Sequence, residues 1–70
     1  MTPYRIVVRG VVDAARMPLI EDARIAHTGA VTTIELPVID QSHLDGVLVM
    51  LRDCGTALVS VQPLTRPEEG

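Results

Sequence analysis

Two histidines and one cysteine are the side chains of this 70-residue chain best suited to chemistry near neutral pH. His43 lies between Asp40 and Asp45, so three metal-ligating residue types are close together in the sequence. Metal sites need several convergent ligands, and the sequence contains no His-Glu-x-x-His pattern. We therefore expect a capping Asp40, a solvated His43 and no bound metal.

Cys54 is the only cysteine, which excludes a disulfide within the chain and a cysteine-rich zinc site. It ends a predicted helix, where the negative end of the helix dipole disfavours a thiolate. We expect it to be a small buried apolar residue. Histidine is the usual general base near neutral pH, so an enzyme would need His27 or His43 in that role. We assign no catalytic residue, and the sequence favours a non-enzyme.

The basic side chains are all arginines, and the absence of lysine excludes a Schiff-base lysine. Arg5 and Arg9 share one face of a predicted strand, the pattern of two solvated charges on an outer sheet face. An anion site is the alternative. A small acid or amino acid could bind near Arg5, Arg9 or Arg24.

The composition excludes several partners. The apolar fraction is 47%, yet Trp and Phe are absent and Tyr4 is the only aromatic residue, so bases have no stacking platform. A net charge of −3 also argues against nucleic acid. We expect no membrane segment, no signal peptide and no cofactor, and the single free cysteine fits a cytoplasmic protein.

The short length favours association. A domain of this size buries only about 60% of the surface that its unfolded chain exposes. Without disulfides or a metal, self-association or a protein partner is the most economical additional support. We expect a single domain over residues 1–64, followed by a flexible tail over 65–70 rich in Pro and Glu.

The pattern of apolar residues predicts an α+β fold of order β-β-β-α-β. It is a mostly antiparallel four-stranded sheet with one helix on one face. Strands are expected at 4–10, 24–28, 31–39 and 56–64, with a hairpin turn at Gly29. In the third strand the even positions face the core: Thr32, Ile34, Leu36 and Val38.

The clearest element is a helix from Gln41 to about Cys54. Asp40 caps its first turn and Gly55 ends it. The buried stripe is expected to be Leu44, Val47, Leu48 and Leu51. Val49 and Met50 fit this stripe poorly. Together with Gly46 and Val47 they could form an apolar patch for a partner.

The other two segments are less regular. In residues 11–23, Asp13 could cap one helical turn that Pro18 ends, with Met17, Leu19 and Ile20 folding over the core; a mobile lid is the alternative. In the last strand Ala57, Val59 and Val61 share one face. The opposite face has Leu58 beside Ser60 and Gln62. Apolar residues on both faces favour a central strand or one covered by a second subunit.

Four segments carry a resemblance to a known family. They are Tyr-Arg-Ile-Val-Val-Arg-Gly at 4–10, Thr-Thr-Ile-Glu-Leu-Pro-Val-Ile-Asp-Gln at 32–41, Leu-Asp-Gly-Val-Leu at 44–48 and Leu-Arg-Asp-Cys-Gly at 51–55. The chain resembles a family of short stand-alone α/β proteins of actinobacterial type with no established activity. The resemblance implies the fold and leaves the function open.

A weaker likeness links residues 44–61, with Gly46 and Gly55, to small-molecule-sensing ACT domains. The ACT pattern needs a second helix, which residues 11–23 do not offer.

The favoured function is a small non-catalytic interaction module, acting as a homodimer or with another protein. A ligand-sensing regulatory module is the alternative. A small enzyme with an intersubunit site is the least favoured.

Overall fold

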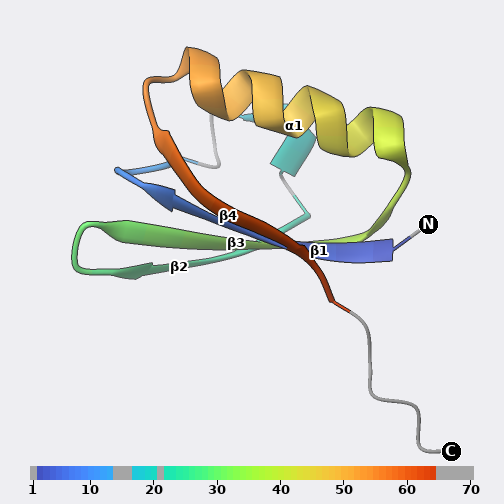
Figure 1. Ribbon diagram of the computed structural model, residues 1–70, viewed down its shortest axis with the longest axis horizontal. Coiled ribbons are helices and arrows are strands. Elements are labelled where there is room, and N and C mark those ends of the chain that lie inside the picture. The colour runs from blue at the N-terminus through green and yellow to red at the C-terminus, as the bar shows by residue number, and fades with distance from the viewer. Residues whose placement is uncertain (1, 14–16, 21, 65–70) are drawn as a thin grey trace, which may run out of the picture.

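The computed structural model describes residues 2–13, 17–20 and 22–64. In chain order the elements are β1 (Thr2–Arg9), η2 (Pro18–Ile20), β2 (Arg24–Thr28), β3 (Val31–Ile39), α1 (Gln41–Asp53) and β4 (Ala57–Pro63). The expected α+β fold of order β-β-β-α-β is therefore confirmed, with a short 3-10 turn, η2, in the first connection (Figure 1).

The sheet has the order β2-β3-β1-β4, and each neighbouring pair is antiparallel. β1 and β3 are central, whereas β2 and β4 are the two edges. α1 lies over one face of the sheet, and no other described element covers the opposite, open face (Figure 1). Antiparallel sheets commonly keep one face on the core and one in water.

The register of the paired strands determines which side chains form the core under α1. Ile6 of β1 lies beside Ile34 of β3, which in turn lies beside Ile25 of β2, so the three side chains share the face under α1. η2 covers one side of this layer with buried Ile20, next to buried Met17, as predicted. Leu19 was predicted to fold over the core as well, but it is 39% exposed, so that part of the prediction was wrong. The buried apolar core is Ile6, Val8, Val12, Met17, Ile20, Ile34, Leu36, Ile39, Leu44, Val47 and Leu51.

An irregularity in β3 shifts its last residues. Thr2 pairs with Ile39 and Tyr4 pairs with Leu36, so β3 contributes one residue more than β1 between these positions. The extra residue reverses the alternation beyond Pro37, which cannot donate a ladder hydrogen bond. Ile39 is consequently 7% exposed and Val38 is 54% exposed. The prediction that Val38 faces the core was wrong.

A second bulge changes the faces of β4. Val7 pairs with Ser60 and Val8 pairs with Leu58, which leaves Val59 as an additional residue. Leu58 therefore lies beside Val8 on the face toward α1. Strict alternation predicts instead that Leu58 and Val61 lie on opposite faces of the sheet. β4 is also an edge strand, so the prediction of a central strand was wrong. The alternative, a strand covered by a second subunit, stays a prediction.

The ends of α1 follow the predicted caps. The His43 N–H donates to Asp40 Oδ1 at 2.9 Å, and Gly55 adopts a φ of 86° just after the helix. Cys54 is exposed, so its predicted burial was wrong: it is the cap residue that follows the last turn, beyond the buried stripe. The helical turn expected at 14–17 falls mainly on residues 14–16, which lie outside the described residues, as does the tail expected at 65–70.

Candidate functional site

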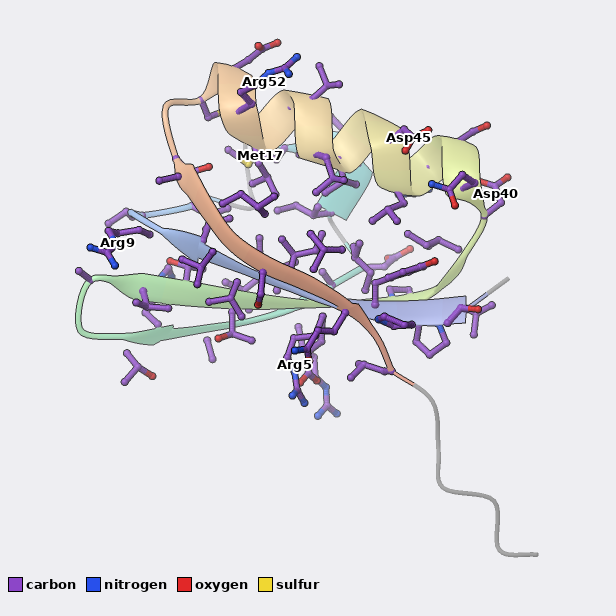
Figure 2. The ribbon with its side chains drawn as sticks, viewed as in Figure 1. Arg5, Arg9, Met17, Asp40, Asp45 and Arg52 are labelled. Atoms are coloured by element: carbon purple, nitrogen blue, oxygen red, sulfur yellow. The ribbon has the colours of Figure 1, made fainter. Side chains whose placement is uncertain are left out.

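The three arginines of the predicted anion site lie on the open face of the sheet but do not converge. Arg5 donates through Nε and a terminal nitrogen to one carboxylate oxygen of Glu35, at 3.1 and 3.0 Å. Arg24 occupies the other side of Glu35, its partner across β2 and β3. Arg9 lies at the far end of β1 (Figure 2). Glu35 therefore already supplies the negative charge between Arg5 and Arg24.

The acidic and histidine side chains at the start of α1 are engaged separately. His43 Nε2 is 2.8 Å from the Leu19 carbonyl oxygen; a carbonyl only accepts, so Nε2 carries the proton. Asp45 Oδ1 accepts from the Gln41 side-chain amide at 3.2 Å. His43 is thus half-buried and ties η2 to α1, where a solvated ring was expected. Among the described residues, no group of three His, Cys, Asp or Glu side chains could hold a metal ion.

His27 belongs to a hydrogen-bond chain at the β2 edge. Thr32 is fully buried, and its hydroxyl donates to the Gly10 carbonyl oxygen at 2.6 Å. Because that hydroxyl has one proton, His27 Nδ1, 3.0 Å away, must donate to Thr32 Oγ1. The pair fixes the imidazole against β3, a structural role that sequence spacing does not reveal.

The predicted patch of Gly46, Val47, Val49 and Met50 is not one surface, and the prediction was wrong for Val47, which is fully buried in the core. A Cβ atom on Gly46 would lie 3.3 Å from Leu19 Cδ1, so this glycine accommodates the close approach of η2. Met50 is half-buried and packs against the core. Val49 is 47% exposed and lines a groove toward β4. Only Val49 of the four belongs to an open apolar surface.

That groove runs between α1 and the edge strand β4 and has a volume of about 340 Å³. Its floor is formed by buried Val8 and Leu51. Its walls are Leu48, Val49, Arg52, Thr56 and Leu58. Leu58 could not be assigned to this groove from the sequence, because strict alternation along β4 places it on the opposite face of the sheet. The groove has an apolar lining and a single charged side chain, Arg52, at its rim.

β4 itself continues this surface to the edge of the sheet. Its seven residues, Ala57–Pro63, include no charged side chain. Leu58 is 56% exposed and Val59 is 53% exposed. β4 pairs with β1 on one side only, so alternate backbone N–H and C=O groups on its other side lack a strand partner. We call β4 together with the groove the β4 edge surface.

Comparisons with known proteins place the chain in a family but do not assign a function to the β4 edge surface. Within the described part of the chain, no helix is long and apolar enough to cross a membrane. A search of curated proteins and a search of solved structures both returned no match. A family model described as a domain of unknown function, DUF8691, matches residues 3–62. This match covers all the strands and the helix except the ends of β1 and β4, and the chain belongs to that uncharacterised family.

Proposed function

We propose that this protein is a small non-catalytic interaction module that binds another polypeptide through the β4 edge surface. The observation that carries the proposal is an uncharged edge strand with half-exposed Leu58 and Val59 beside an open apolar groove. An unpaired edge can accept a further strand through main-chain hydrogen bonds, while side-chain pockets provide specificity. The groove between α1 and β4 supplies such a pocket.

The chemistry of the remaining surface favours this role over ligand sensing. On the open face, Arg5 and Glu35 form an ion pair with each other. The histidines are bonded to Leu19 and Thr32. Exposed apolar side chains grouped along one edge, by contrast, are characteristic of protein-binding sites.

A charge placed on each edge tests the proposal. Val59→Lys adds a positive side chain at the exposed bulge of β4, a substitution that natural edge strands use against pairing. Thr28→Lys adds the same charge to the exposed end of β2 and is the matched control. Immobilised wild-type protein and Thr28→Lys protein are expected to capture the same polypeptide from source-cell extract. Val59→Lys protein is expected to lose it.

Equal capture by the Val59→Lys and Thr28→Lys proteins would contradict the role of β4. Absence of any captured polypeptide, the chain itself included, would contradict an interaction module. Far-ultraviolet circular dichroism of all three proteins confirms that each is folded.

We also propose a bacterial, cytoplasmic setting. The exposed Cys54 thiol is suited to a reducing compartment, where thiols stay reduced. The exclusive use of arginine among basic residues is consistent with a genome rich in G and C, as the resemblance to actinobacterial-type proteins implies. Fractionation of source cells with an antibody to the chain tests the compartment.

A further inference from the structure

We infer that the partner at the β4 edge surface is a second copy of this chain, with the two β4 strands paired antiparallel about a twofold axis. The assignment rests on the proposed function and adds the identity of the partner. The two sheets would then join into one, with both α1 helices side by side on the same face. Closed twofold contacts use the same patch on both copies, so that patch must be complementary to itself.

The first line of support is a charge pattern on α1. Asp45, Leu48, Val49 and Arg52 follow the i, i+3, i+4, i+7 spacing of one helical stripe. Leu48, Val49 and Arg52 line the groove, so this stripe faces β4, next to the buried stripe. Asp45 and Arg52 lie at opposite ends of it (Figure 2). The stripe thus has a negative end, an apolar middle and a positive end.

An antiparallel copy of this stripe matches it. When two α1 helices run in opposite directions about a point between Leu48 and Val49, Asp45 faces Arg52 of the partner subunit. The reciprocal pair forms at the other end, and the apolar residues meet in the middle. Complementary charges across an interface fix register and exclude other arrangements. A parallel arrangement would bring like charges together.

The second line of support is that α1 and β4 share a centre. α1 has 13 residues and extends about 20 Å at ~1.5 Å per residue. β4 has 7 residues and extends about 23 Å at ~3.3 Å per residue. The two elements run in opposite directions, one above the other (Figure 1). A twofold axis through the middle of β4 therefore also passes near the middle of α1.

The third line of support is the backbone of β4. The Leu64 N–H donates to the Pro3 carbonyl oxygen at 2.7 Å. This bond shows which residues of β4 direct their N–H and C=O groups toward β1. Bonds to one neighbour alternate along an antiparallel strand, so Val61 turns its N–H and C=O away from β1. Two copies of Val61 can then bond to each other. Pro63 has no N–H and ends the pairing, and no charged side chain of β4 repels its own copy.

The test is the solution molar mass of the full chain, measured by light scattering and sedimentation from about 1 µM to about 1 mM. We expect a wild-type dimer that dissociates on dilution. Asp45→Arg and Arg52→Asp each place like charges at both ends of the interface, and each is expected to raise the dimer dissociation constant about tenfold or more. The double variant, Asp45→Arg with Arg52→Asp, restores opposite charges and is expected to return within about twofold of wild type.

The mass measurements test separately the dimer, the pairing of the α1 helices and the pairing of the β4 strands. A wild-type monomer over the whole range would overturn the second copy as partner, while capture of a different polypeptide in the edge-charge experiment would leave the proposed function intact. A dimer that ignores both single substitutions, or that the double variant does not restore, would overturn the paired helices. A dimer that Val59→Lys does not weaken would overturn the pairing of β4. Circular dichroism confirms the fold of each variant.

Discussion

The two edge strands of the sheet differ in length, charge and apolar exposure. β2 has five residues, and Arg24, His27 and Thr28 among them are exposed polar side chains. β4 has seven residues, none of them charged, and Leu58 and Val59 are exposed large apolar side chains on it. Both strands have the same unpaired backbone on their outer side. The difference between them is therefore in strand length and in the side chains, and not in backbone pairing.

Natural sheets protect their edges with short strands, charges, proline and bulges. β2 combines short length with a charge and an imidazole fixed on Thr32. β4 has its bulge at Val59 and a terminal Pro63, which confine pairing to a short segment without preventing it. The β2 edge is thus protected against pairing with another strand, whereas the β4 edge presents a short apolar site. A restricted site of this kind favours a specific contact over indefinite aggregation.

The largest expected effect concerns the core beneath the β4 edge. Leu51 is 2% exposed and forms the floor of the groove. Leu51→Ala is expected to lower the free energy of unfolding by about 2–5 kcal/mol, because a buried cavity remains. Ile25→Ala, at a half-buried position of β2, is expected to cost less. Urea denaturation of the two variants measures the difference, and an equal loss would contradict a core centred toward α1.

A smaller effect is expected at the β2 side. Thr32→Val keeps the side-chain shape but removes the hydroxyl that donates to Gly10 and accepts from His27. The expected loss in the free energy of unfolding is about 1–3 kcal/mol, because the Gly10 carbonyl and His27 Nδ1 both lose this hydroxyl as hydrogen-bond partner. Thr33→Val, on the open face, is the matched control and should change stability by less than about 0.5 kcal/mol. Similar values for both variants would show that the hydrogen-bond chain does not stabilise β2.

Local rules predicted most of the fold. The bounds of β2 and β3 and the caps of α1 followed from alternation, from Gly29 and from Asp40. The faces of Val38 and Leu58 did not, because each lies at or beyond a bulge. A bulge arises from how two strands pair, and neither strand specifies it alone.

The candidate site was predictable only in part. Val49 was identified because it falls outside the buried stripe, and its exposure agrees. Gly46 and Met50 were grouped with it by proximity in sequence, but η2 packs against Gly46 from within the chain. The position of η2, like the hydrogen bond from His43 to Leu19, depends on contacts between distant segments. Helical periodicity contains no information about those contacts.

Amide hydrogen exchange at the two edges, followed as a function of protein concentration, tests the central claim most directly. The Val61 amide, which faces away from β1, is expected to exchange quickly in dilute protein and to become protected as concentration rises. Outward amides of β2 should exchange at the same rate throughout, since that edge has no partner in the proposed assembly. A Val61 rate that is independent of concentration, or protection that appears at β2 instead, would contradict the assignment of β4 as the binding edge.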